Sequence, residues 1–147
     1  WGQLQLNREF FGRVFQTMSE SVEMVIAERA GKVIGGAFNL TAHDRLYGRY
    51  WGCFEEHPFL HFNVCFYQSI DDCIRAGRRV FEPGAGGEHK IARGFQPSAI
   101  HSLHRIFHPK LDRAVRDFVA REGEEVADVV GRGAEISGMK PWVPPVP

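Results

Sequence analysis

The sequence predicts a mixed α/β fold with an antiparallel first half and a parallel strand–helix–strand crossover in its second half. Two apolar runs, residues 23–29 and 33–40, are joined by a short glycine-containing turn at residues 30–32, which is typical of a β-hairpin. Further along, a helical stripe of apolar residues lies between two runs with strand character, residues 60–64 and 79–82. Because a strand–helix–strand connection within one sheet pairs its strands in parallel, the sheet is predicted to be mixed.

The first half of the chain contains one helix and three strands. Apolar residues at helical spacing predict an amphipathic helix over residues 3–18; they are Leu6, Phe10, Phe11, Val14, Phe15 and Met18. In the hairpin that comes next, Gly35 and Gly36 indicate a bulge or a close approach of another backbone. Residues 46–54 read as a third strand, which begins after a turn at His43–Asp44.

The crossover begins with a predicted fourth strand over residues 60–64. A helix starts from Phe66, and its apolar stripe contains Phe66, Ile70, Cys73 and Ile74. Asp71 and Arg75 are spaced to form an ion pair on this helix, and Gly77 is placed to terminate it. Residues 79–82 form the strand that completes the crossover.

Beyond the crossover, the sequence predicts a loop at residues 83–87 and a strand-like stretch over residues 98–107. A long amphipathic helix is expected from Lys110, after Pro109, with Gly123 at a position where it can break. We assign residues 1–140 to one domain and residues 141–147 to a proline-rich tail.

Composition places the chain among ordinary globular proteins. Its 147 residues are 44% hydrophobic and 24% charged, which excludes a disordered or low-complexity chain. Lysine plus arginine and aspartate plus glutamate both number 18, so the basic excess of a nucleic-acid-binding domain is absent. No apolar run approaches the roughly 20 residues of a membrane span, and the opening residues lack a signal-peptide pattern.

The cysteines and the first residue carry further expectations. Cys53, Cys65 and Cys73 are odd in number and form no C-x-x-C pair, which favours buried, inert thiols in a reducing, cytoplasmic compartment. The chain starts at Trp1 and not at methionine, inside what reads as a helix. We therefore expect it to be part of a longer protein.

The most unusual segment is residues 81–90, where a candidate binding loop comes directly after a strand. Glu82 ends that strand, and open α/β sheets bind ligands beyond the carboxyl ends of their strands. The loop glycines Gly84, Gly86 and Gly87 would let backbone amides approach an anionic group. The segment nevertheless matches neither G-x-G-x-x-G, which would need glycine in place of His89, nor a Walker A loop. A functional loop and a plain glycine-rich connection both fit this spacing.

Other reaction centres find less support. His101, His104 and His108 are unevenly spaced, and Pro58 separates His57 from His61, so no metal site is expected. The sequence has no G-x-S-x-G motif, and no cysteine lies in a setting that would activate its thiol.

Three stretches resemble one bacterial family. They are Tyr50–Trp51–Gly52, LHFNVCFYQ at residues 60–68 and FEPGAGGEHKIARGFQP at residues 81–97. Together they resemble the predicted N-acyltransferases of the peptidoglycan biosynthesis/recognition group, relatives of the GNAT and FemAB-type acyltransferases. The resemblance covers roughly residues 20–120. It implies a GNAT-like fold and the C-terminal half of a longer protein, whose N-terminal half would be a partner.

The resemblance implies that an acyl or aminoacyl group is transferred to an amine, with a peptidoglycan precursor as one acceptor. Amine attack needs a proton acceptor, for which Glu82 and His89 are the candidates. Donor and acceptor contacts are expected from a wider set, in which Lys90 and Arg93 would hold anionic groups. The set is Tyr67, Gln68, Gly84, Gly86, Gly87, Glu88, Lys90 and Arg93.

The sequence leaves two questions open: the identity of the donor, and whether the domain is a catalyst. Backbone amides at a helix start near residues 66–69 would suit the pyrophosphate of an acyl-CoA, which favours a thioester slightly over an aminoacyl-tRNA. However, residues 64–70 contain no glycine, whereas the GNAT acetyl-CoA loop has the pattern Q/R-x-x-G-x-G/A. The alternative is therefore a non-catalytic GNAT-shaped module that recognises a cell-wall precursor or a protein partner.

Overall fold

The computed structural model describes residues 6–85, 87–133, 135 and 138. The chain divides into two compact units, Trp1–Ala85 and Gly86–Pro147, and each is described by itself. This boundary falls inside the residues 1–140 that the sequence assigns to one domain. The predicted tail at residues 141–147 lies outside the described residues.

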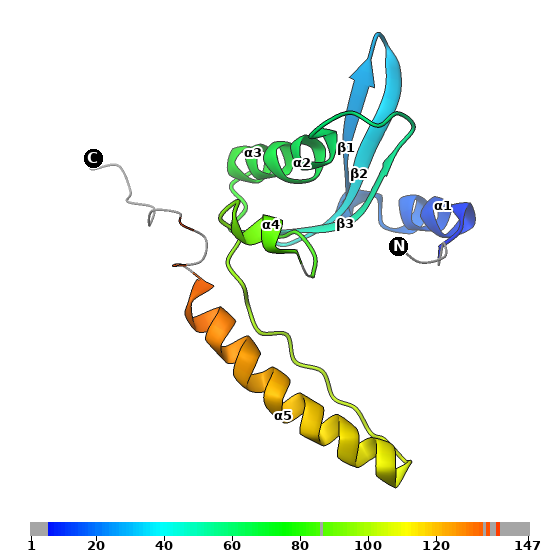
Figure 1. Ribbon diagram of the computed structural model, residues 1–147. Coiled ribbons are helices and arrows are strands. Elements are labelled where there is room, and N and C mark those ends of the chain that lie inside the picture. Colours follow the sequence, from blue (N-terminus) through cyan, green and yellow to red (C-terminus); the bar gives the residue numbers. More distant parts are fainter. Residues whose placement is uncertain (1–5, 86, 134, 136–137, 139–147) are drawn as a thin grey trace. The chain divides into compact units, whose positions relative to one another are not determined.

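The first unit is built on a four-stranded mixed sheet with the strand order β1-β2-β3-β4. β1 (Val22–Arg29), β2 (Lys32–Ala42) and β3 (Arg45–Cys53) form an antiparallel meander (Figure 1). β4 (Val80–Glu82) pairs with β3 in parallel. The mixed α/β class, with its antiparallel first half and parallel crossover, is therefore confirmed.

The β1–β2 hairpin has the turn and the close approach that its glycines predict. Ala30 and Gly31 both have positive φ angles, of 49° and 74°, as a two-residue hairpin turn requires. The pairing register shifts opposite Ala27 and Glu28, where Ile34 is the extra residue of β2. A Cβ atom on Gly36 would lie 2.9 Å from the backbone oxygen of Val25, so this position needs glycine.

The predicted strand over residues 60–64 is wrong, because these residues are helical. α2 (Leu60–Phe62), the π-helical turn η2 (Asn63–Tyr67) and α3 (Gln68–Arg75) succeed one another without a break. A five-residue segment with apolar residues at positions 60, 62 and 64 fits a strand or a helix, since both periods place Leu60 and Val64 on one side. The strand that precedes the crossover is therefore β3.

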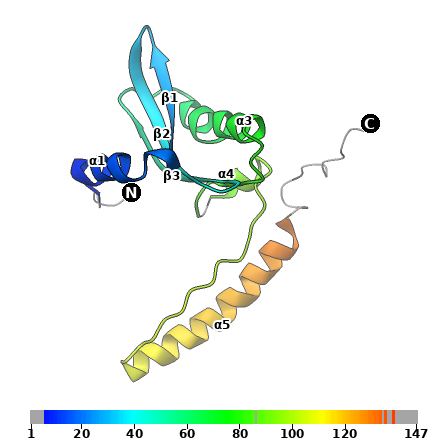
Figure 2. The same cartoon turned by 180° about the vertical axis from the view of Figure 1, so that it is seen from behind.

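Helices lie on both faces of this sheet. α2, η2 and α3 cover one face, where Val25, Ala37 and Val64 form the core (Figure 2). α1 (Arg8–Thr17) packs on the other face through Phe11, whose ring meets Phe38 edge-on at 5.5 Å. The predicted first helix is confirmed over these residues, and the short 3₁₀ helix η1 (Ser19–Ser21) links it to β1.

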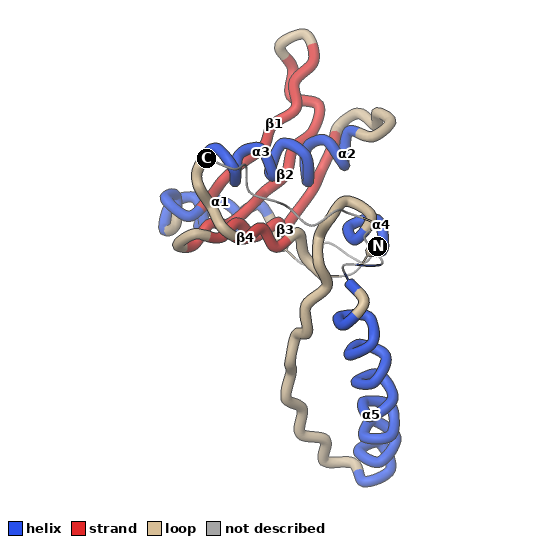
Figure 3. The backbone as a smooth tube through the Cα atoms, turned by 90° about the vertical axis from the view of Figure 1, so that its left-hand side faces the viewer, coloured by secondary structure: helices blue, strands red, loops and turns tan. Residues whose placement is uncertain are grey.

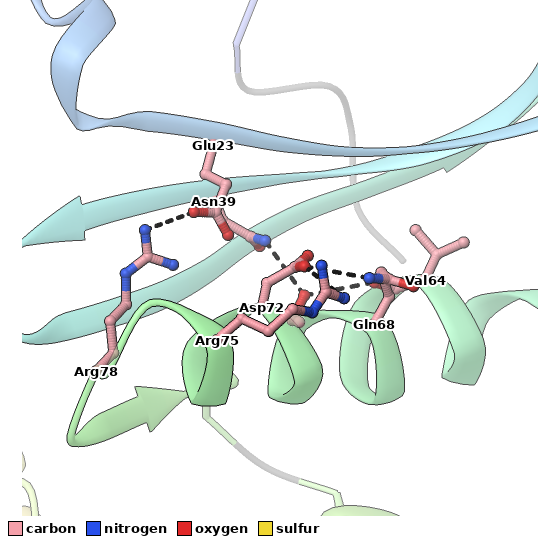
Figure 4. Close-up of polar contacts among 8 residues, drawn as sticks. Glu23, Asn39, Val64, Gln68, Asp72, Arg75 and Arg78 are labelled. Carbon is pink, nitrogen blue, oxygen red and sulfur yellow. Dashed lines mark hydrogen bonds and ion pairs between the residues drawn. The ribbon is translucent and has the colours of Figure 1, made fainter.

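A Schellman turn and an ion pair tie the end of α3 to β1. Gly77 has a φ of 65° and ends the helix as predicted, and the amide of Arg78 donates to the Cys73 carbonyl at 2.9 Å. The Arg78 guanidinium lies 2.6 Å from the Glu23 carboxylate, and both side chains are mostly buried (Figure 4). The hydrogen bond to this carboxylate raises the pKa of Arg78.

A second buried polar contact lies between the sheet and the helix. The Asn39 amide donates to the Ser69 hydroxyl at 3.3 Å, and Asn39 is only 1% exposed (Figure 4). Ser69 is fully buried and donates in turn to the backbone oxygen of Val64 at 3.4 Å. These bonds satisfy polar groups that would otherwise be costly to bury.

Two details of α3 differ from prediction. Ile74 is 72% exposed, so it does not belong to the buried stripe that contains Phe66 and Cys73. Arg75 pairs with Asp72 at 3.1 Å, and the predicted pairing with Asp71 is wrong. The π-helical turn inserts one residue and rotates every later residue about the helix axis, which moves Ile74 out of the buried stripe. It does not alter the spacing within α3, where Arg75 has carboxylates both three and four residues before it and contacts the nearer one.

In the second unit, α4 (Glu88–Ile91) precedes an extended segment and the 23-residue helix α5 (Pro109–Gly131) (Figure 3). The strand predicted over residues 98–107 is wrong: these residues are irregular and almost all exposed. α5 is confirmed, with Pro109 in its first turn and the His108 ring accepting from the Leu111 amide. Gly123 does not break it.

Gly36→Ala is expected to lower the free energy of unfolding by about 1–3 kcal/mol, because the new methyl group would press on the β1 backbone. The control is Gly52→Ala on the neighbouring strand: Gly52 pairs with Gly36, and a Cβ atom there meets nothing within 4 Å. This control is expected to stay within about 0.5 kcal/mol of the parent. Urea unfolding monitored by circular dichroism measures both, and equal losses would contradict the predicted close approach.

Candidate functional site

Glu82 lies at the carboxyl end of β4, where the sequence places the candidate site. Its register partner on β3 is Tyr47, and its Oε1 atom lies 3.1 Å from Nη1 of Arg45. Both side chains of this ion pair are about half exposed. Sequence reasoning missed Arg45, because it placed residues 60–64 and not β3 beside this strand. The parallel β3–β4 register is the signal that finds it.

Beyond Glu82 the chain stays close to β3 before it turns away. A Cβ atom on Gly48 would lie 3.5 Å from Cα of Pro83 and 3.6 Å from the Glu82 carbonyl, which is ordinary contact. Gly84 then adopts a φ of 90°, a conformation that other residues rarely adopt. This geometry fixes where the glycine loop starts relative to the Glu82 carboxylate.

Tyr67 and Gln68 lie at the end of the π-helical turn. The Tyr67 side chain is 49% exposed, and the Gln68 amide donates to Asp72 at 3.1 Å (Figure 4). The backbone N–H of Gln68 donates to the Asn63 carbonyl, so it is engaged within the helix. The predicted amide cradle at residues 66–69 is therefore wrong, because the helix starts at Leu60.

The remaining candidates belong to the second unit. Gly87 has a φ of 95°, and a Cβ atom there would lie only 2.5 Å from the His89 ring. Arg93 donates to the His89 carbonyl at 2.6 Å, which ties the ends of this helical turn together. Burial lowers the pKa of Lys90. The positive φ thus favours glycine at residue 87. The exposed His89 follows two residues later, and the cationic side chains of Lys90 and Arg93 come after it.

The structure describes the predicted site residues in two groups. The first unit contains Tyr67, Gln68, Glu82 and Gly84. The second unit contains Gly87, Glu88, His89, Lys90 and Arg93. Glu88 is described only as the first residue of α4, and Gly86 lies outside the described residues. Each group is therefore defined within its own unit.

The cysteines offer no activated thiol, although they are less uniformly buried than predicted. Burial raises the pKa of Cys65 to about 11. Burial also raises the pKa of Cys73, against a smaller opposing effect of Arg78. Cys53 is exposed, so the expectation of burial is wrong there. It is the last residue of β3.

Metal clusters and membrane-spanning helices can be assessed for the described part of the chain. There, no three histidine, cysteine, aspartate or glutamate side chains gather in a way that could hold a metal ion. Within the same residues, none of the helices combines the length and the apolar character needed to cross a membrane.

Comparison with protein families identifies the chain. The family model FemAB_like, described as peptidoglycan biosynthesis/recognition, matches residues 1–140. The chain therefore belongs to the FemAB-like family, as the resemblance of residues 81–97 predicts. Neither the curated proteins nor the solved structures contain a match.

At pH 8, Cys53 is expected to react first with Ellman's reagent, whereas Cys65 and Cys73 react slowly until the protein unfolds. Only the thiolate is nucleophilic, and burial holds Cys65 as a thiol. Because burial raises the pKa of Cys65 from 9.0 to about 11, the unfolded chain loses this proton at a lower pH than the folded one. The free energy of unfolding is therefore expected to be unaffected by this thiol below pH 9 and to fall between pH 9 and pH 11. Cys53→Ser should abolish the fast phase, and a fast phase that survives this substitution would contradict the assignment.

Proposed function

We propose that this FemAB-like domain transfers an acyl or aminoacyl group from an activated donor to an amine of a peptidoglycan precursor. The observation that carries the proposal is the family match over residues 1–140, which includes every candidate site residue. The family description supplies the link to peptidoglycan, and acyl transfer is our inference.

The sheet topology supports the proposal. An antiparallel meander, then a helix and a parallel strand, is the order expected of a GNAT-like domain. In open α/β sheets, substrates bind beyond the carboxyl ends of parallel strands. Glu82 occupies that position on β4, and the glycine-containing loop begins directly after it.

In the proposed reaction, the amine nitrogen of the acceptor forms a bond to the carbonyl carbon of the donor, and the bond from that carbon to sulfur or oxygen breaks. The attacking amine loses a proton, which Glu82 or His89 would accept directly or through water. Arg45 contacts Oε1 of Glu82 and so orients the carboxylate, leaving Oε2 as the oxygen proposed to take the proton.

The donor is proposed to be an acyl thioester such as acyl-CoA, with an aminoacyl-tRNA as the competing donor. The zero net charge disfavours the extensive phosphate contacts that a tRNA needs. Because the amides of residues 66–69 are not at a helix start, Lys90 and Arg93 take over the proposed role of holding donor phosphates.

Either Glu82→Gln or His89→Ala is expected to lower kcat by about 100-fold or more, since one of these two residues is the proposed proton acceptor. The matched control is Asp44→Asn: Asp44 is also a partly exposed carboxylate paired with an arginine, Arg79, at 3.8 Å. It should leave turnover unchanged. The assay measures amide formation by the natural protein across pH 6–9, and full activity in both site variants would overturn their roles.

A second candidate function is recognition of a cell-wall precursor without catalysis. The family description contains "recognition", and one oxygen of the Glu82 carboxylate is already engaged by Arg45. On this proposal, Glu82 would bind the ligand and would not transfer protons.

Titration calorimetry of the natural protein with acyl-CoA, aminoacyl-tRNA and muropeptide fragments separates the two functions. The transferase is expected to bind acyl-CoA and a muropeptide and to convert them. Muropeptide binding without donor binding or turnover would establish the recognition module. Turnover with aminoacyl-tRNA alone, falling steeply as salt rises, would overturn the thioester preference.

A further inference from the structure

The helix α5 exposes an apolar stripe that the described residues of its own unit leave uncovered. None of its 23 residues is buried, and both Leu111 and Phe118 are 54% exposed. Val119, Val126 and Val130 continue the stripe and are also exposed. An exposed apolar stripe along a whole helix is typical of an interaction surface.

Apart from Val119, whose mirror position is Glu122, the stripe is symmetric about the midpoint of the helix. Leu111 and Val130 are equally far from the point between Ala120 and Arg121, as are Val115 and Val126. Phe118 and Gly123 are likewise equidistant, and a Cβ atom on Gly123 would meet nothing within 4 Å. In an antiparallel pair of identical helices, each residue faces its mirror position. Aliphatic residues would then meet each other, and the Phe118 ring would lie over Gly123 of the second copy.

The charges of α5 change sign along the helix. Residues 109–120 carry three basic and two acidic side chains, whereas residues 121–131 carry one basic and four acidic ones. This order opposes the helix dipole, which favours acidic groups at the amino end and basic groups at the carboxyl end. The stability of the single helix therefore does not explain the order. An antiparallel pair places each basic half beside an acidic half, whereas a parallel pair would bring the two acidic halves together.

We propose that α5 pairs antiparallel with α5 of a second copy of this chain, about a two-fold axis between Ala120 and Arg121. Such an interface is closed, because the same surface serves both copies. At about 1.5 Å per residue, the helix offers roughly 34 Å of contact length. The proposal rests on α5 alone and is independent of the proposed transferase activity.

Two charge-reversed variants of the 147-residue chain test the pairing. The acidic variant carries Lys110→Glu, Arg113→Glu and Arg121→Glu, and the basic variant carries Glu122→Lys, Glu124→Lys and Glu125→Lys. Both sets of changes leave the Arg116–Asp112 pair of 2.7 Å intact. Apart from Arg121 and Glu122 near the midpoint, they also improve agreement with the helix dipole.

Sedimentation velocity over about 1–200 μM is expected to show a monomer–dimer equilibrium for the parent chain. Each variant alone should dissociate about tenfold more readily, and an equimolar mixture of the two should dimerise at least as well as the parent. Circular dichroism checks that both variants keep their helix content. A parent chain that stays monomeric throughout, or dimers insensitive to both reversals, would overturn the proposal.

Disulfide cross-linking tests the orientation in a Cys53→Ser background, which removes the exposed native thiol. A mixture of the Leu111→Cys and Val130→Cys chains should form cross-linked dimers under mild oxidation. Leu111→Cys alone should not, because an antiparallel pair keeps its two copies of residue 111 at opposite ends. Efficient linking of Leu111→Cys to itself would mean parallel pairing and would overturn the proposed interface.

Discussion

The ion pair between Glu23 and Arg78 ties the end of α3 to β1 in the first unit. It joins the start of β1 to the residue just after the Schellman turn, at 2.6 Å and in mostly buried surroundings. Removing one partner would leave a largely buried charge unpaired, which is strongly destabilising. The chain that leaves this point donates from Arg79 to the Asp44 carbonyl and then forms β4 beside β3. The position of Glu82 against Arg45 therefore depends on a contact with the far edge of the sheet.

The elements predicted correctly are those whose sequence signals lie within the element itself. The hairpin is predicted by two apolar runs joined by a glycine-containing turn at residues 30–32, and α5 by its apolar stripe and by Pro109 at its start. Residues 60–64 could not be assigned in this way, because five apolar-rich residues satisfy both periods and tertiary packing decides between them. Because residues 60–64 were assigned as the strand beside residues 79–82, β3 was not recognised as the first strand of the crossover. Arg45 was therefore missed as the partner of Glu82, since no sequence pattern near Glu82 indicates that contact. The phase of α3 was equally inaccessible, since η2 adds a residue that the sequence does not mark.

The candidate site shows the same division between local and distant information. Glycine is favoured at residue 87 because its φ of 95° is a conformation that other residues rarely adopt, and the local sequence of the loop predicts glycine-dependent geometry there. The expected amide cradle at residues 66–69 failed because a helix start is defined by the residues before it, and the helix already begins at Leu60. A long sequence motif such as residues 81–97 is enough to predict the family. The contacts of individual side chains, in contrast, depend on the register of the sheet.

The parallel pairing of β4 also has a consequence for the order in which the fold is assembled. The meander of β1, β2 and β3 closes through tight turns at residues 30–31 and 43–44, so its contacts are near in sequence and form quickly. β4 can pair with β3 only after the intervening residues 54–79 have folded back across the sheet, which is a longer loop closure. With only three residues in its ladder, β4 is also the strand of this sheet held by the fewest backbone bonds. The carboxyl end that presents Glu82 is therefore expected to be the last part of the sheet to form and the first to open.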